Sequence, residues 1–156
     1  MEKNLTIRYR EFAVEDPQIA EERQLLEKAI AATDSAYAPY SHFHVGAAVL
    51  LEGGVVVTGS NQENIAYPSG LCAERVALFS ASAQYPNKKI LALAIVARNE
   101  EGHLTEASPC GACRQVFAEM EMRQQMPFKL ISFLDGDKIR IIEGVENLLP
   151  FIFTFQ

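Results

Sequence analysis

Three cysteines place the strongest constraint on how this chain can fold. Cys110 and Cys113 come from one local turn, whereas Cys72 lies far earlier in the chain and must be brought to them by the fold. An odd number of cysteines that includes a C-x-x-C pair argues against the disulfide framework of a secreted protein. It favours a role in metal binding or redox chemistry. Each cysteine precedes or opens a predicted helix, whose positive N-terminal end stabilises thiolate and favours metal ligation.

The ligand set predicts an open zinc site. Three thiolates around Zn²⁺ leave one tetrahedral position, which structural sites fill with protein and catalytic sites keep for water. Glu74 lies two residues after Cys72, so on a helix its carboxylate can reach around the metal and carry protons without binding it. Arg75 can donate to the sulfurs and offset their negative charge. A structural-zinc module is the alternative, and it predicts a fourth protein ligand and no need for Glu74.

Charge and composition argue against several classes of partner. The chain has 156 residues, 49% of them hydrophobic, and at this length a single domain over residues 1–156 is expected. A formal charge of −6 and a pI near 5.1 argue against binding nucleic-acid phosphates or an anionic membrane. No apolar run has the length of a membrane span or a signal peptide, so a cytoplasmic location is expected.

The apolar patterns predict an α/β fold with a mixed sheet. Period-2 or β-branched runs predict strands at residues 4–12, 45–51, 55–59, 90–97, 128–134 and 139–142. Helical spacing predicts helices from residue 17 to before Pro39, over 71–83 and over 111–122. The first strand is expected to form a sheet edge or an arm.

Four blocks of sequence closely resemble the small, tetrameric, zinc-dependent cytidine deaminases. The blocks are residues 40–48, 59–75, 108–115 and 148–153, in this order, and the match spans about residues 19 to 153. Cys72-Ala73-Glu74 and the run from Pro109 to Cys113 fit the deaminase signature of a cysteine ligand, a non-ligating glutamate and P-C-x-x-C. Gln62, His44 and Ile65-Ala66 stand where the family usually has other residues.

The resemblance implies a three-layer α/β/α fold with about five strands and one Zn²⁺ per subunit. It implies that Cys72, Cys110 and Cys113 hold the zinc and that Glu74 is the general acid/base. The implied reaction is hydrolysis of cytidine and 2′-deoxycytidine to uridine, 2′-deoxyuridine and ammonia, in pyrimidine salvage. A deaminase of a modified cytosine nucleoside such as blasticidin S is an alternative of the same chemistry.

The resemblance also implies substrate contacts. Asn61 and Glu63 match the pair that binds the ribose 3′-hydroxyl in the family, and Phe43 matches the aromatic residue that packs against the base. Backbone groups of Ala73 and Cys110 are expected to read the edge of the pyrimidine.

A homotetramer with shared active sites is a further implication of the resemblance. Tyr67 and Phe153 match residues that lie near a neighbouring subunit's pocket in the family. Phe151, Phe153 and Phe155 alternate as in a strand and are too apolar for a free tail, which favours an interface. Residues 1–18 fall outside the resemblance, and we hypothesise that they also lie at a subunit interface; truncation that leaves the oligomer unchanged would contradict this.

Overall fold

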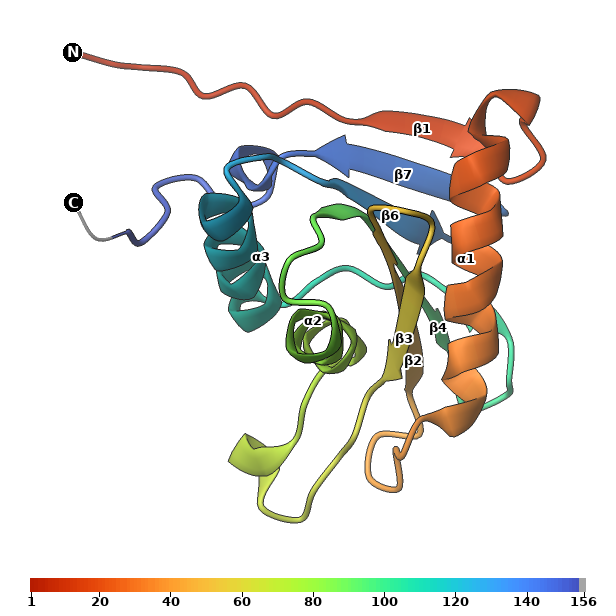
Figure 1. The fold of residues 1–156 in the computed structure, drawn as a ribbon. Helices are drawn as coiled ribbons and strands as arrows, with labels where there is room; N and C mark the ends of the chain where they lie inside the picture. Colours follow the sequence, from red (N-terminus) through yellow and green to blue (C-terminus); the bar gives the residue numbers. More distant parts are fainter. Residues whose placement is uncertain (155–156) are drawn as a thin grey trace.

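The predicted strands form one mixed sheet in a computed structural model that describes residues 1–154 (Figure 1). The strand order is β1-β7-β6-β4-β2-β3, and a short β5 pairs with β4. The strands are β1 (Arg10–Ala13), β2 (His44–Leu51), β3 (Val56–Ser60), β4 (Ile90–Arg98), β5 (Leu104–Thr105), β6 (Lys129–Leu134) and β7 (Lys138–Glu143). β4 and β6 run parallel, and the other pairs are antiparallel. The predicted α/β fold with a mixed sheet is confirmed, and β1 and β5 make the sheet seven-stranded rather than about five-stranded.

Helices cover both faces of this sheet (Figure 1). The helices are α1 (Ala20–Ala32), α2 (Ala73–Gln84) and α3 (Gly111–Gln124), with 3-10 turns η1 (Pro17–Ile19), η2 (Thr33–Ser35), η3 (Tyr67–Ser69) and η4 (Val145–Asn147). On one face, α1 buries Leu25, Leu26 and Ala29, whose spacing of three and four residues forms a single stripe. On the other face, α2 and α3 bury a second cluster that includes Leu78 and Phe117.

Gly59 allows α2 to lie directly on β3. A Cβ atom at Gly59 would lie 2.5 Å from the backbone N of Ala77 and 2.8 Å from the backbone O of Ala73. The helix contributes only small side chains at this contact, because Ala73 and Ala77 are fully buried there. The first turn of α2, which carries Glu74, is therefore held against the sheet by backbone-to-backbone packing.

Gly59→Ala is expected to destabilise the protein by about 1–3 kcal/mol, because the added methyl group forces α2 away from β3. The free energy of unfolding in urea measures this change. Gly111→Ala is a matched control, since a Cβ at Gly111 meets no atom within 4 Å. Equal urea midpoints for the two variants would show that the close approach of α2 at Gly59 does not contribute to the free energy of unfolding.

The strand predicted at residues 4–12 is wrong in its extent. The structure has a strand only at Arg10–Ala13, and the residues before it extend as an arm (Figure 1). Arg10 lies opposite Ile141, and β7 continues only two residues further, to Glu143, so residues 1–7 have no partner in β7. The prediction of a sheet edge or an arm is therefore confirmed for both: Arg10–Ala13 form an edge strand, and the residues before them form an arm.

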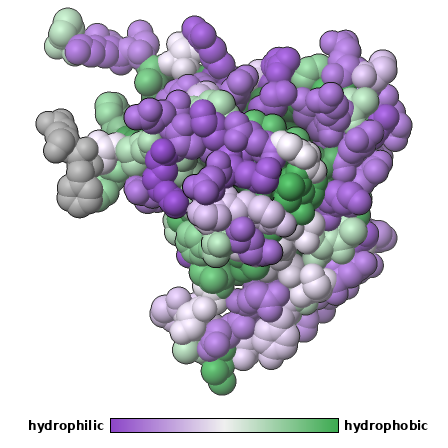
Figure 2. Space-filling model, viewed as in Figure 1, coloured by the Kyte–Doolittle hydropathy of each residue, from purple (hydrophilic) through white to green (hydrophobic). Residues whose placement is uncertain are grey.

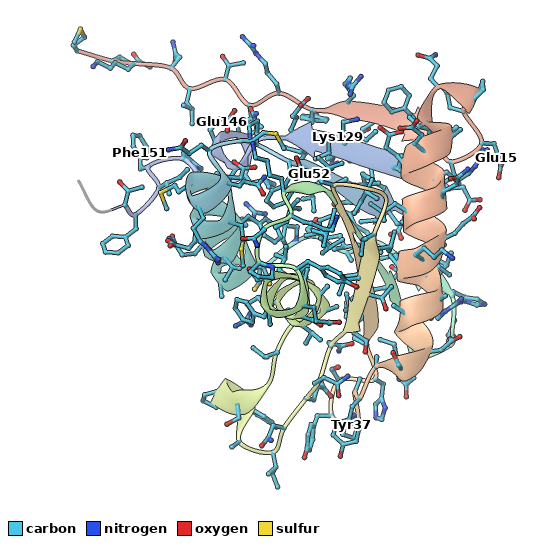
Figure 3. All side chains as sticks on the ribbon, viewed as in Figure 1. Glu15, Tyr37, Glu52, Lys129, Glu146 and Phe151 are labelled. Carbon is cyan, nitrogen blue, oxygen red and sulfur yellow. The ribbon has the colours of Figure 1, made fainter. Side chains whose placement is uncertain are left out.

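The strand-like alternation at the C-terminus does not form a strand over residues 151–154, and Phe155 lies outside the described residues. Phe151 has a positive φ of 57°, which is incompatible with an extended strand. Its side chain projects from the molecule in Figure 3 and is 98% exposed. Over the described residues, the helices are all too short or too polar to cross a membrane.

Candidate metal centre and pocket

The fold brings the three cysteines together at the starts of two helices. Cys72 is the N-cap residue of α2, and Cys110 is the N-cap residue of α3, whose Sγ accepts a hydrogen bond from the N–H of Cys113 at 3.4 Å. All three Sγ atoms lie within 4.8 Å of one another. The positive ends of both helices therefore point at the sulfurs, as predicted, and stabilise thiolates.

The sulfur spacing fits zinc. The Sγ of Cys110 lies 3.7 Å from the Sγ of Cys72 and 3.5 Å from the Sγ of Cys113. A tetrahedral zinc with Zn–S bonds of about 2.3 Å requires sulfur atoms about 3.8 Å apart. Within the part of the chain that the structure describes, these cysteines are the one group of His, Cys, Asp and Glu side chains placed to hold a metal ion.

Arg75 supplies positive charge to this cluster. Its Nη2 donates to the Sγ of Cys72 at 3.5 Å, and this contact raises the pKa of the guanidinium further. The Nε of Arg75 is buried without a hydrogen-bond partner among the described residues, which is costly unless a negative group lies nearby.

Hydrogen bonding from the Cys113 thiol lowers the pKa of Cys72 to about 5, and the same interaction raises the pKa of Cys113. Cys72 thus becomes a thiolate before Cys113.

Glu74 is a buried carboxyl beside the sulfurs. Its side chain lies on the first turn of α2, and the residue is only 4% exposed. Burial raises the pKa of Glu74 to about 7, which is suited to taking up and releasing protons near neutral pH. Glu74 therefore lies beside Cys72 on the first turn of the helix, shielded from solvent.

A pocket of about 810 Å³ opens in front of the metal centre. Many predicted site residues line it, namely Phe43, Asn61, Glu63, Tyr67, Cys72, Glu74, Arg75 and Cys110. Cys113 and Ala73 are fully buried behind its wall. Phe153 does not line the pocket of its own chain.

Asn61 and Glu63 organise one wall of the pocket through backbone groups. Asn61 Nδ2 donates to the carbonyl of Phe43 at 2.8 Å, and its Oδ1 accepts from the N–H of Val45 at 2.7 Å. Glu63 Oε1 accepts the N–H groups of Tyr40 at 2.9 Å and Ser41 at 3.1 Å. The Ser41 hydroxyl, followed by these backbone donors, lowers the pKa of Glu63, so this side chain is an anion at neutral pH.

The remaining motif residues hold the C-terminal block. Arg114 Nη1 donates to the carbonyl of Leu148 at 2.8 Å, and Gln115 Nε2 donates to the carbonyl of Phe153 at 3.3 Å. Phe153 is 70% exposed, and Tyr67, which meets Tyr40 edge to face at 5.9 Å, is 75% exposed. Both aromatic rings thus present apolar surface to solvent.

Sequence reasoning missed Glu106, Ala107 and Ser108, which also line the pocket. These residues belong to the loop between β5 and α3, and Asp135 Oδ1 fixes this loop by accepting from the N–H of Glu106 at 3.0 Å. The one available signal was their position just before the cysteine pair. The contact with Asp135 links segments far apart in the chain, so no local pattern predicts it.

Comparison with known proteins assigns this arrangement to a family. Residues 19–128 match the family model described as the cytidine and deoxycytidylate deaminase zinc-binding region. The chain belongs to this deaminase family. Residues 1–18, which lie outside the resemblance in the sequence, also lie outside the matched range.

Relatives and solved structures of this deaminase family resemble most of the chain. The cytidine deaminase of Halalkalibacterium halodurans is 40% identical over 134 residues, which cover 86% of this chain and 95% of that protein. The cytidine deaminase of Sporosarcina psychrophila is 45% identical over 84% of this chain and 90% of its own length. The crystal structure of cytidine deaminase from Burkholderia pseudomallei superposes with a TM-score of 0.71 and 38% identity, covering 83% of this chain and 97% of that chain. The resemblance to zinc-dependent cytidine deaminases is thereby confirmed, and with it a zinc-binding deaminase domain.

Proposed function

We propose that this chain hydrolyses cytidine and 2′-deoxycytidine to uridine and 2′-deoxyuridine, with release of ammonia. The observation that carries the proposal is the buried carboxyl of Glu74 beside a three-sulfur metal centre at the back of a nucleoside-sized pocket. The relatives and the crystal-structure neighbour described above are all cytidine deaminases, which supports the same substrate.

Glu74 carries the protons of the reaction. Cys72, Cys110 and Cys113 would hold a zinc ion, which would supply a Lewis acid that makes a water molecule more acidic. Glu74 accepts a proton from this water, donates a proton to N3 of the base, and passes a proton to the amino group on C4. C4 gains an oxygen and loses ammonia, so one water is consumed for each ammonia released. The pKa of about 7 allows Glu74 to act in both directions.

The pocket walls position the nucleoside. Phe43 packs against the base. Asn61 holds Phe43 in place by donating a hydrogen bond to the backbone carbonyl oxygen of Phe43. Asn61 and Glu63 match the pair that binds the ribose 3′-hydroxyl in the family, and we propose the same role for them here. Their position on one pocket wall, where backbone hydrogen bonds fix both side chains, supports it. Backbone groups of Ala73 and Cys110 read the pyrimidine edge. Arg75 offsets the negative charge of the sulfurs through its bond to Cys72.

A homotetramer completes the proposed active sites. Tyr67 and Phe153 are strongly exposed in the single subunit and would cover a neighbouring subunit's pocket. A cytoplasmic enzyme of pyrimidine salvage is the proposed cellular role. Sedimentation velocity tests the assembly, and a fully active monomer would contradict shared sites.

The loss of cytidine absorbance in the presence of the purified, zinc-loaded protein tests the reaction. Cytidine and deoxycytidine are expected to be deaminated, and CMP and blasticidin S are not. Turnover of blasticidin S alone would favour the modified-nucleoside alternative. A folded, zinc-loaded protein that leaves all four compounds unchanged would contradict the deaminase assignment and favour a structural-zinc module.

Asn61→Asp is expected to raise the KM for cytidine by about tenfold with a smaller effect on kcat, because an orphaned carbonyl costs about 1–3 kcal/mol. The aspartate can still accept from Val45 but cannot donate to the carbonyl of Phe43. Asn99→Asp is the matched control, since Asn99 does not line the pocket and its Oδ1 only accepts, from the N–H groups of Glu101 at 3.1 Å and His103 at 2.9 Å. Steady-state kinetics of both variants measure the difference, and equal KM values would argue against a positioning role for Asn61.

A further inference from the structure

The N-terminal arm, defined here as residues 1–9, carries apolar side chains that its own subunit leaves exposed. Leu5, Ile7 and Tyr9 alternate with polar residues and are 61%, 51% and 56% exposed. The start of the arm stands clear of the rest of the surface in Figure 2, and the arm continues the line of β1 in Figure 1. The proposed deaminase chemistry makes no use of it, and it lies outside the range matched by the family model.

The side chains of the arm continue the alternation of β1. Glu11 accepts from Arg140 at 2.8 Å, and the guanidinium of Arg140 lies 5.2 Å from the centre of the Tyr9 ring. Phe12 and Val14 pack on the opposite face of the sheet, against the α1 cluster. Because successive side chains of a strand point to opposite faces, Leu5 and Ile7 share the face of Tyr9 and Glu11.

The backbone of the same residues faces the open edge of the sheet. The N–H of Arg8 donates to Asn147 Oδ1 at 2.9 Å, and the N–H of Val14 donates to the carbonyl of Asp137 at 2.9 Å. Both bonds lie on the β7 side of the segment, and alternate residues of an antiparallel strand direct their backbone groups to opposite edges. The N–H and C=O groups of Ile7 and Tyr9 are therefore directed outward, where no strand follows β1 among the described residues.

We propose that the arm and β1 pair antiparallel, about a two-fold axis at Ile7, with the same segment of a second copy of this chain. A register with Ile7 opposite Ile7 places Leu5 opposite Tyr9 and Lys3 opposite Glu11, each pair occurring twice. The exposed face then consists of apolar pairs flanked by pairs of opposite charge. This self-complementarity selects a second copy as the partner, because a two-fold interface must pair each residue with its symmetric counterpart. Pairing also satisfies an edge strand that otherwise presents unpaired backbone groups.

Single cysteines test the register. Under mild oxidation of the full, zinc-loaded chain, Ile7→Cys is expected to form a disulfide-linked dimer, because only a residue on the two-fold axis meets itself. Thr6→Cys and Arg8→Cys are matched neighbours and are expected to stay monomeric on a non-reducing gel, like the wild type. Equal cross-linking at all three positions indicates random collision and contradicts the register, and absence of cross-linking at residue 7 contradicts the pairing.

A charge at the axis tests the energetics. Ile7→Lys places two ammonium groups opposite each other, which destabilises a strand pair, and it is expected to raise the concentration of half-dissociation by about tenfold in sedimentation velocity. Val56→Lys on β3, at the opposite edge of the sheet, is the control and is expected to leave this concentration unchanged. An unchanged Ile7→Lys assembly, or an equal effect of Val56→Lys, would overturn the proposal. Neither measurement reads deaminase activity, so the outcome is independent of the proposed reaction.

Discussion

Glu74→Gln is expected to lower kcat for cytidine by about 10²- to 10⁴-fold, the usual range for loss of a general acid–base group. Glutamine keeps the size of the side chain and fits the same buried position, but it cannot accept the proton of the attacking water or return it to the leaving amine. The zinc content and the urea midpoint are expected to remain close to those of the wild type, because Glu74 lies beside the sulfurs without being needed as a ligand.

Stopped assays of ammonia release measure this loss, with zinc content determined on the same preparation. Glu27→Gln, an exposed carboxylate on the far helix α1, is the matched control and is expected to retain full activity. A zinc-replete, folded Glu74→Gln protein that deaminates cytidine at the wild-type rate would contradict the assignment of Glu74 as the general acid–base group.

Cys113→Ser is expected to abolish both zinc binding and deaminase activity. Cys113 is fully buried and its Sγ lies 3.5 Å from that of Cys110, so its loss leaves two cysteines for the metal. A hydroxyl is a poor zinc ligand compared with a thiolate. Zinc at a hundredfold excess over its Kd stabilises a folded protein by about 2.7 kcal/mol, and the variant loses this contribution.

Urea unfolding with and without added zinc measures the difference. The wild type stripped by a chelator provides the comparison, because it is expected to unfold near the midpoint of the variant and to recover on addition of zinc. The variant is expected to show no recovery. Stoichiometric zinc in Cys113→Ser, or a wild type indifferent to the chelator, would mean that these cysteines do not form the metal site.

Local chemistry explains why much of the site could be predicted from the sequence. Cys110 and Cys113 are close in the chain, and Glu74 and Arg75 follow Cys72 within one helical turn, so spacing alone places each group on its helix. The helix boundaries confirm this, because both Cys72 and Cys110 are N-cap residues. The mixed sheet was predictable for the same reason, since strand periodicity is a property of short segments.

Other features depend on segments that meet only after folding. Glu106 lines the pocket, and its backbone is held there by Asp135, which lies in the turn between β6 and β7. The arm has the alternation of a strand, yet β1 begins only at Arg10, and β7 ends at Glu143 and so offers residues 1–7 no partner. In the sequence, Gly59 looks like an ordinary strand residue. Only the structure shows that α2 lies within contact distance of it.

The sequence by itself therefore determined the zinc-binding chemistry and the class of fold and predicted Glu74 as the proton carrier, because these follow from residue types at short spacing. Only the tertiary structure decided that Cys72 reaches the cysteine pair, that the pKa of Glu74 rises through burial, and that the N-terminal residues remain an open edge. The physical reason is that burial and strand pairing depend on contacts between segments that are distant in the chain. The periodicity of one segment does not predict which other segment it will contact.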